Sequence, residues 1–189
     1  MTVQIIENFV SDSDADTIVQ GLIPFLVKSG INRPAMAETQ FEGPSPDPVR
    51  LMFTEIVNRV AKEINNFYEV DVVPIQSLMA QTSKGGKNDG LHCDSVQIDG
   101  RLWQDVNPKL DSLEFSALVY LNESGTDYSG GEIRFPNQEL VIKPQTGQMI
   151  FFRGDVDHPH GVSEVTSGER YALVLFYARQ TPAAVSGLH

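Results

Sequence analysis

The sequence predicts a mainly β protein of the α+β class, in which two N-terminal helices pack on one face of a β barrel or sandwich. Two observations carry this prediction. Apolar residues recur at helical spacing within residues 1–70, and short β-type runs separated by turn residues fill residues 71–180. The length of 189 residues suits one domain. We therefore expect a single domain over residues 1–189, with a helical support region followed by a β-barrel core.

The composition argues against several classes of protein. Asp and Glu number 25 against 14 Lys and Arg, a net charge of −11 that opposes sequence-independent binding to nucleic-acid phosphates. With Cys93 as the one cysteine, no internal disulfide framework is expected. We find no secretory signal and no stretch approaching the ~18 apolar residues of a membrane span. We expect a cytoplasmic protein with no nucleic-acid or membrane partner, and leave its oligomeric state open.

The first helix follows a strand-like opening at residues 3–10. The run SDSDAD supplies capping Ser and Asp, and apolar residues then lie three and four apart from Ile18 to Leu26, until Gly30 ends the pattern. Pro24 inside this pattern is expected to kink or shorten the helix.

The second helix has the most regular pattern in the chain. Its apolar residues are again three and four apart, at Val49, Met52, Phe53, Ile56, Val57, Val60, Ile64 and Phe67. Between the two helices, residues 31–48 mix Pro, Gly and polar side chains, which predicts a surface loop.

The β-type runs follow one another closely after Asp71. They are VDVVPIQSLMAQ, LHCDSVQ, EFSALVYLN, GEIRF, ELVIK, QMIFF, GVSEV and RYALVLFYA, separated by KGG, SGTDYSGG, PN, PQTG and TSGE. RYALVLFYA is apolar on both faces, which predicts a central strand covered on both sides. Residues 98–112 form a longer connection that contains Trp103, either a lid residue over a site or a core aromatic.

Two short histidine motifs are the strongest candidates for chemistry. In a strand, His92 and Asp94 would point to the same face, where a histidine from a distant strand could complete a metal site. Two imidazoles and one carboxylate on one face of an octahedral metal are the ligand set of non-haem Fe(II) oxygenases. Alone, a His-x-Asp sequence is more often a hydrogen-bonded pair or a solvated turn. Arg170 adds a second signal, because a guanidinium at the head of the most apolar strand needs an anionic partner.

Several motifs in order resemble the Fe(II)/2-oxoglutarate-dependent dioxygenases, and specifically their prolyl 4-hydroxylase-like branch. LHCDS resembles the HxD of the first barrel strand, FSALVYLNES the second strand, and YSGGEIRFP the GGE turn. VIKPQTGQMIFF, DHPHGVSEV and GERYAL resemble the later strand, distal-histidine and basic-residue blocks. The resemblance covers most of the chain and implies a double-stranded β-helix, a jelly-roll or cupin-like barrel.

The resemblance also implies roles for individual residues. His92, Asp94 and His160 would ligate Fe(II), and Arg170 and Tyr120 would hold the C5 carboxylate of 2-oxoglutarate. The cofactors would be Fe(II), 2-oxoglutarate and O2, with ascorbate as a candidate stimulant. The presence of Asp94 favours hydroxylation over halogenation, because related halogenases lack this carboxylate.

Two departures from the family pattern concern the cosubstrate site. Thr82 and Ser83 stand where many members have a tyrosine, and Ile133 replaces a frequent threonine after GGE. They leave the three proposed ligands and Arg170 untouched, but put the details of 2-oxoglutarate binding and a prolyl substrate in question.

Some assignments stay open at the level of sequence. His158 competes with His160 as the distal ligand, although spacing to the basic residue favours His160. Tyr120 also fits a plain core aromatic. Trp103, Arg134 and Arg153 are candidate substrate contacts, and the sequence does not show which way they point.

Three functional hypotheses remain, besides a nucleic-acid oxidative demethylase of the same class, which the net charge of −11 opposes. The first is a hydroxylase that couples oxidative decarboxylation of 2-oxoglutarate, to succinate and CO2, with hydroxylation of an aliphatic C–H of a prolyl or other amino-acid or peptide substrate. The second is a hydroxylase of the same class acting on a small molecule. The third is a non-catalytic module that senses a metal or 2-oxoglutarate.

Overall fold

The computed structural model describes residues 2–28, 35–38, 48–85, 88–98 and 112–180. The N-terminal part runs in the order β1 (Gln4–Ile6), α1 (Asp12–Leu22), the 3₁₀ helix η1 (Ile23–Phe25), β2 (Val27–Lys28), β3 (Ala35–Glu38) and α2 (Pro48–Tyr68). The part that follows contains β4 (Val72–Ser83), β5 (Asn88–His92), β6 (Leu113–Tyr120), β7 (Tyr128–Gly130), β8 (Ile133–Phe135), the 3₁₀ helix η4 (Pro136–Gln138), β9 (Leu140–Ile142), β10 (Met149–Arg153), β11 (His160–Val162) and β12 (Val165–Arg179).

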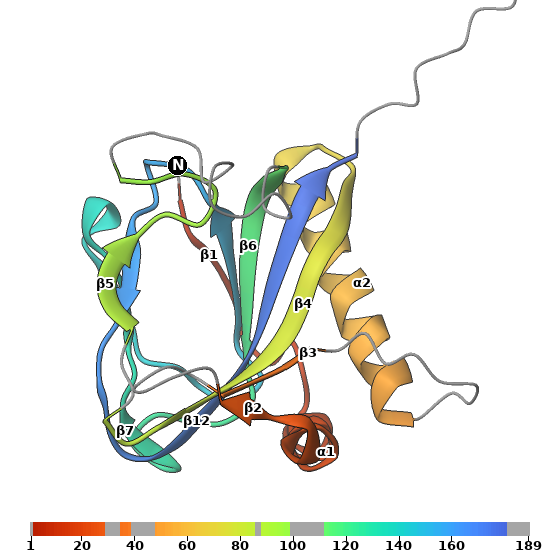
Figure 1. Ribbon diagram of the computed structural model, residues 1–189. Coiled ribbons are helices and arrows are strands. Elements are labelled where there is room, and N and C mark those ends of the chain that lie inside the picture. The colour runs from red at the N-terminus through yellow and green to blue at the C-terminus, as the bar shows by residue number, and fades with distance from the viewer. Residues whose placement is uncertain (1, 29–34, 39–47, 86–87, 99–111, 181–189) are drawn as a thin grey trace, which may run out of the picture.

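The strands form two sheets that face each other (Figure 1). The large sheet has the order β1-β10-β6-β12-β4-β3-β2, with β7 pairing to the first residues of β12, and the small sheet has the order β5-β11-β8-β9. Both helices lie on the outer side of the large sheet (Figure 1). The predicted class, a mainly β domain with two support helices, is confirmed.

Both predicted helices form for the expected reasons. Ser11 caps α1 by accepting a hydrogen bond from the backbone N–H of Asp14 at 3.2 Å. α1 ends at Leu22, and Pro24 lies in the following η1, so the proline shortens the helix as predicted. α2 turns its buried residues to the large sheet, namely Phe53, Ile56, Val57, Val60 and Ile64.

Alternation along the strands of the large sheet divides the core into two parts. In β10, Met149 and Phe151 belong to the core under the helices, whereas Ile150 and Phe152 belong to the core between the two sheets. β12 follows the same rule and lies between β4 and β6, which confirms that it is a central strand covered on both sides. Each central strand therefore carries one face to the helices and one to the space between the sheets.

Two predictions from local pattern were wrong. The predicted surface loop at residues 31–48 includes β3, which pairs with β4 at the sheet edge. The predicted breaks SGTDYSGG and TSGE contribute β7 and the first residues of β12, which pair with each other. These strands depend on partners distant in sequence, so their composition alone indicated turns.

Neither α1 nor α2, nor any other described helix, is both long enough and apolar enough to cross a membrane.

The contact between α2 and the large sheet should dominate stability. Ile64 is fully buried in the core under the helices, so Ile64→Ala leaves a cavity and should lower the free energy of unfolding by about 2–5 kcal/mol. Urea denaturation at neutral pH measures this loss. Val141→Ala is the control, since Val141 is 68% exposed on β9 and its truncation should cost less than about 0.5 kcal/mol. Equal losses in the two variants would contradict this account of the core.

Candidate metal centre

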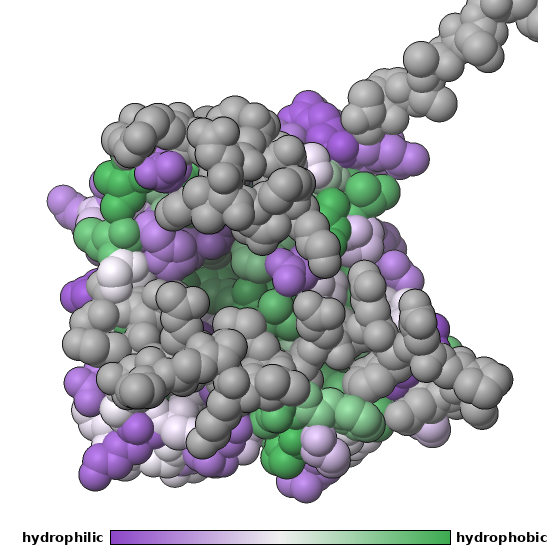
Figure 2. Space-filling view, in the orientation of Figure 1, coloured by the Kyte–Doolittle hydropathy of each residue, from purple (hydrophilic) through white to green (hydrophobic). Residues whose placement is uncertain are grey.

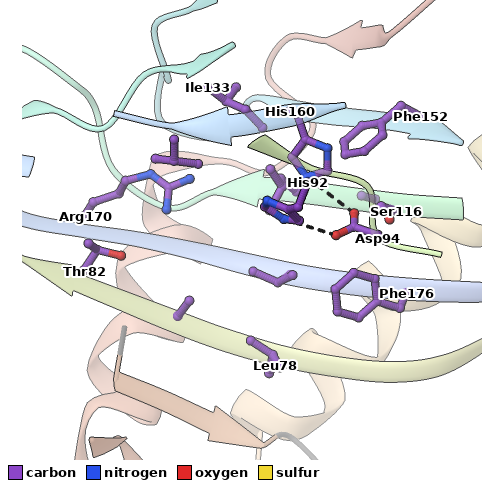
Figure 3. Close-up of a pocket in the computed structure, with 15 residues that line it drawn as sticks. Leu78, Thr82, His92, Asp94, Ser116, Ile133, Phe152, His160, Arg170 and Phe176 are labelled. Carbon is purple, nitrogen blue, oxygen red and sulfur yellow. Dashed lines mark ion pairs between the residues drawn. The ribbon is translucent and has the colours of Figure 1, made fainter. Parts of the chain in front are cut away.

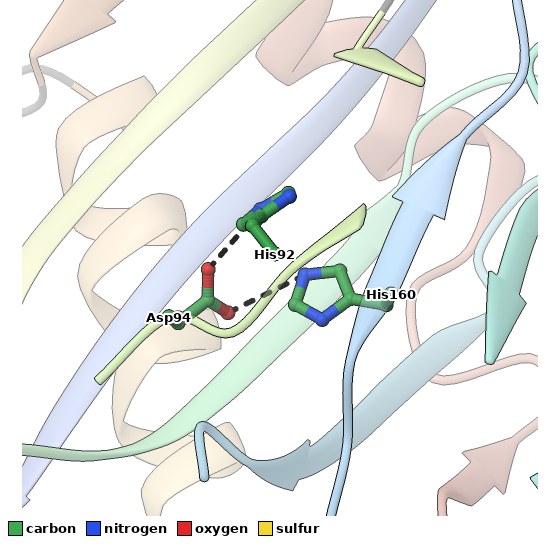
Figure 4. Close-up of side chains that lie close together, drawn as sticks. All are labelled: His92, Asp94 and His160. Atoms are coloured by element: carbon green, nitrogen blue, oxygen red, sulfur yellow. Dashed lines mark ion pairs between the residues drawn. The ribbon is translucent and has the colours of Figure 1, made fainter. Parts of the chain in front are cut away.

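His92, Asp94 and His160 form one cluster beside the small sheet (Figure 4). His92 ends β5 and pairs directly with His160, which begins β11, and their ring centroids are 4.5 Å apart. The two carboxylate oxygens of Asp94 lie 3.5 Å from Nε2 of His92 and 3.6 Å from Nε2 of His160. The three potential ligand atoms all lie within 4.8 Å of one another, so one metal ion could bind all of them.

The backbone reaches this geometry by a different route from the one predicted. β5 ends at His92, and Asp94 lies in a bend rather than in the strand, so strand alternation does not place the carboxylate. Instead, the backbone N–H and the hydroxyl of Ser95 both donate to the carbonyl of Gly154, at 2.9 and 2.7 Å. A Cβ on Gly154 would lie 2.8 Å from Leu113 and 3.3 Å from the Asp94 side chain. Gly154 therefore allows the bend that carries Asp94 to approach β10 closely.

Both histidines offer the same nitrogen to the centre. Nδ1 of His92 lies 2.9 Å from the carbonyl of Gly90, and Nδ1 of His160 lies 3.1 Å from the carbonyl of His158. A carbonyl only accepts, so each Nδ1 carries the proton and each Nε2 is left for a metal. Such outer hydrogen bonds are typical of histidine ligands.

The two imidazoles and the carboxylate of the cluster shift one another's pKa values. A hydrogen bond to Asp94 raises the pKa of His92 against the opposing effect of burial. Burial lowers the pKa of His160, although the charge of Asp94 opposes this. Burial would raise the pKa of Asp94, but the charge of His160 and the hydrogen bond with His92 outweigh it and lower the pKa. Asp94 is therefore held as a carboxylate between the two imidazoles.

The structure separates the two histidines between which the sequence left a choice. His158 is fully buried, and its Nδ1 lies 2.7 Å from the Asp155 carboxylate, outside the cluster. Its backbone carbonyl accepts the hydrogen bond from Nδ1 of His160. This placement favours His160 as the distal ligand.

Metal titration tests this assignment. Alanine at His92, Asp94 or His160 removes one of three ligands and should abolish tight binding of Mn(II) or Co(II), measured by calorimetry on the full chain. His158→Asn is the matched control, because the asparagine amide can still donate to Asp155 while the backbone carbonyl is unchanged. Loss of the metal in His158→Asn with retention in His160→Ala would reverse the assignment.

A pocket of about 210 Å³ extends from this cluster between the two sheets. Thr82 and Arg170 lie at one end, whereas Phe152 and Phe176 lie on the side of Asp94 away from Arg170 (Figure 3). Among the described lining residues, Arg170 is the one cation and Asp94 the one carboxylate. Figure 2 shows a hollow with an apolar floor in the middle of the face where the two sheets separate. The pocket thus combines a metal site, a cationic end and an apolar part.

The cationic end is buried and has no counter-ion among the residues that the structure describes. Arg170 is 5% exposed, and no carboxylate of the described residues forms an ion pair with it. Its guanidinium carbon lies 5.3 Å from the centre of the Tyr120 ring. An unpaired buried charge costs several kcal/mol, so this end of the pocket is suited to an anionic ligand.

Two tyrosine hydroxyls near Arg170 are also unpaired. The hydroxyls of Tyr120 and Tyr128 and Nε of Arg170 are buried and make no hydrogen bond to the described residues. Each such group costs about 1–3 kcal/mol when it stays unsatisfied. Burial raises the pKa of Tyr120 to about 12 and that of Tyr128 further, with the charge of Arg170 opposing both shifts. Both hydroxyls therefore keep a proton that they can donate to a carboxylate.

Sequence reasoning missed Tyr128, because it lies in a segment that read as a turn. Of the two residues at the position of the family's tyrosine, Thr82 lines the pocket and pairs with Arg170 across β4 and β12, whereas Ser83 does not line it. Ile133 is fully buried and also lines the pocket. Two of the departures from the family pattern, Thr82 and Ile133, thus lie on the pocket wall itself.

Of the three candidate substrate residues, Arg134 and Arg153 do not line the pocket. Arg134 is exposed on the face of β8 opposite Ile133. Arg153 shares the helix side of β10, where its guanidinium lies 2.7 Å from Glu114 and 3.4 Å from Asp155. Trp103 lies outside the described residues. Contact of Trp103, Arg134 and Arg153 with the substrate stays a prediction.

The GGE turn is tied to the strand that carries the distal histidine. Ser163 donates its hydroxyl proton to the Glu132 carboxylate and accepts from the backbone N–H of Glu132 at 3.1 Å. The Ser163 backbone N–H donates to the Glu132 carbonyl at 2.9 Å. The hydrogen bond from Ser163 lowers the pKa of Glu132.

This shift predicts a pH-dependent contribution to stability. Because the folded-state pKa is lowered, the Glu132 carboxylate stabilises the fold above its unfolded pKa of 4.5, and this contribution is lost as the pH falls through the folded-state value. Glu132→Gln should lower the free energy of unfolding at pH 7 by about 1 kcal/mol or less. Urea denaturation should show this difference shrinking below pH 4.5. The exposed Glu55→Gln is the control, and a Glu132→Gln difference that grows in acid would refute the assignment.

The comparisons with known proteins agree with this site. Residues 78–178 match the family model described as the 2OG-Fe(II) oxygenase superfamily, and these residues include all three members of the metal cluster and Arg170. The chain therefore belongs to this superfamily.

The curated relatives that the chain matches include prolyl 3-hydroxylases. Prolyl 3-hydroxylase 2 of Rattus norvegicus is 27% identical over 155 residues, which are 72% of this chain and 22% of the relative. The chain thus spans about a fifth of the length of the curated relatives it matches.

Two solved structures share the fold over nearly the whole chain. The viral collagen prolyl hydroxylase of Paramecium Bursaria Chlorella virus-1, in its 2OG complex, has a TM-score of 0.65 and 19% identity, covering 96% of this chain and 97% of that one. A prolyl hydroxylase of Trichoplax adhaerens, in complex with a hypoxia inducible factor peptide fragment, has a TM-score of 0.68 and 19% identity, covering 98% and 87%. The expected double-stranded β-helix is confirmed.

The residues present fit the cofactors of this superfamily, Fe(II) and 2-oxoglutarate. His92, Asp94 and His160 supply the two imidazoles and one carboxylate that suit Fe(II) with open positions for further ligands. The unpaired guanidinium and tyrosine hydroxyls suit the distal carboxylate of 2-oxoglutarate.

Proposed function

We propose that the protein is an Fe(II)- and 2-oxoglutarate-dependent hydroxylase that acts on a prolyl residue of a peptide or protein. The reaction would convert 2-oxoglutarate and O2 to succinate and CO2 and place one oxygen atom into a C–H bond of the substrate. The observation that carries this proposal is the placement of a buried, unpaired Arg170 in the same pocket as the His92–Asp94–His160 cluster.

Different residues of the pocket would bind the iron and the 2-oxoglutarate. His92, Asp94 and His160 would hold the iron, which supplies the redox chemistry when bound. Arg170 would bind and orient the distal carboxylate of 2-oxoglutarate, and its burial strengthens that charge pairing by excluding water. Because Asp94 fills the third protein position, hydroxylation rather than halogenation is expected.

The part of the pocket away from Arg170 supports a hydrocarbon substrate. Phe152 and Phe176 line it beside Asp94 and offer no group that could bind an ion (Figure 3). A pyrrolidine ring, which presents only C–H bonds at its edge, suits such a surface. The prolyl hydroxylases among the relatives and the peptide bound to the Trichoplax enzyme support the same substrate class.

The direct test is hydroxylation of defined substrates. The full chain, with Fe(II), 2-oxoglutarate and ascorbate, should produce succinate and add one oxygen atom to a proline-containing peptide, as measured by mass spectrometry. Free proline, proline-free peptides and small metabolites are compared in parallel. Turnover of free amino acids or metabolites alone would favour a small-molecule hydroxylase, and binding of 2-oxoglutarate without turnover of any substrate would favour a sensor module.

Variants connect this activity to the site. His160→Ala should reduce succinate formation to below about one hundredth, because loss of a ligand costs more than the 10–100-fold typical of outer contacts. Arg170→Gln should raise the KM for 2-oxoglutarate by at least about tenfold, since a charge-assisted hydrogen bond is lost. Lys62→Gln on the exposed side of α2 serves as the control. Unchanged KM values in Arg170→Gln would remove the main support for the proposal.

A further inference from the structure

Tyr128 lies against Arg170 although it does not line the pocket. Gly131 has a φ of +72°, and a Cβ placed on it would lie 2.9 Å from Cδ of Arg170 and 3.0 Å from Cε2 of Tyr128. The two side chains therefore meet over this glycine, with no space for a larger residue between them.

A second glycine fixes the backbone of Tyr128. Gly168 pairs with Tyr128 across β7 and β12, also has a φ of +72°, and a Cβ there would lie 2.9 Å from the Tyr128 Cα and 3.0 Å from its Cβ. Gly168 precedes Arg170 by two residues in the same strand. The strand that carries the arginine thus also holds the tyrosine in place.

The hydroxyl of Tyr128 is buried close to the guanidinium of Arg170. Tyr128 is 2% exposed, and its hydroxyl makes no hydrogen bond to the described residues. Arg170 contacts the same glycine as Tyr128, and its guanidinium carbon lies 5.3 Å from the centre of the Tyr120 ring. A phenylalanine would fill the same space without burying a hydroxyl.

We propose that Tyr128 is a positioning residue for the 2-oxoglutarate pocket, which orients the Arg170 guanidinium, together with Tyr120, toward the distal carboxylate of the cosubstrate. A tyrosine hydroxyl can accept a hydrogen bond from the guanidinium and so hold the arginine in one orientation, which leaves the other guanidinium N–H groups free to bind the ligand carboxylate. This inference rests on the proposed function, because it concerns the cosubstrate of that reaction.

Binding of 2-oxoglutarate tests the inference apart from turnover. Calorimetry under oxygen-free conditions, on the full chain loaded with Mn(II), compares the wild type with Tyr128→Phe. We expect the Kd for 2-oxoglutarate to rise by about tenfold, the factor that corresponds to one hydrogen bond in a charged network. The Kd for 2-oxopentanoate, which has no distal carboxylate, should change by less than about twofold. In turnover assays the KM for 2-oxoglutarate should rise while kcat stays within about twofold.

Two further variants separate positioning from general damage. Tyr177→Phe removes another buried hydroxyl, which donates to the Val57 carbonyl at 2.8 Å on the helix side of β12, and should leave 2-oxoglutarate binding unchanged. In an Arg170→Lys background, Tyr128→Phe should cause no additional loss, because its effect passes through the guanidinium.

The outcomes distinguish this inference from the proposed function. Unchanged 2-oxoglutarate affinity in Tyr128→Phe, in a protein whose wild type binds 2-oxoglutarate, overturns the role of Tyr128 and leaves the proposed function intact. A full additional loss in the Arg170→Lys background, or an equal loss for 2-oxopentanoate, also overturns it. If the wild type does not bind 2-oxoglutarate at all, the proposed function and this inference both fail.

Discussion

The central position of β12 is the constraint on which the other features depend. This strand pairs with β4, β6 and β7, turns Leu173, Leu175 and Tyr177 to the core under the helices, and turns Arg170 and Phe176 to the pocket. The helices stabilise one face of the strand and so hold the other face rigid. A charged side chain can be kept buried there because the strand that carries it is anchored on both edges and packed from behind.

The metal cluster and the cationic end belong to opposite sheets. His92 and His160 come from one antiparallel pairing in the small sheet, whereas Arg170 comes from the large sheet. The distance between them is therefore set by the packing of the two sheets, through residues such as Ile133, Phe135 and Phe152. A ligand that binds both the metal cluster and Arg170 would link the two sheets. Binding of the cosubstrate should therefore also stabilise the fold.

Sequence patterns predicted the parts of the fold that depend on local periodicity. The helices, the long central strands and the identity of the cluster residues could be predicted, because each leaves a spacing or a motif in the sequence. β3 and β7 could not, since their pairing partners are distant in the chain. Asp94 does join the cluster, but not by the alternation of side chains along a strand that the prediction assumed. Its position depends on the hydrogen bonds between Ser95 and Gly154. Tyr128 was missed because nothing in a turn-like segment indicates which residue it will meet.

The close contact at Gly131 links residues that are far apart in the chain. The GGE turn and the head of β12 cannot vary independently, because a side chain at Gly131 would occupy the space of the Arg170 carbon chain. A substitution at either position changes the volume available to the other, so compensating pairs should be sought together in any redesign of this pocket. The glycine acts here as a spacer that sets the reach of the arginine, and with it the length of the acid that the pocket can hold.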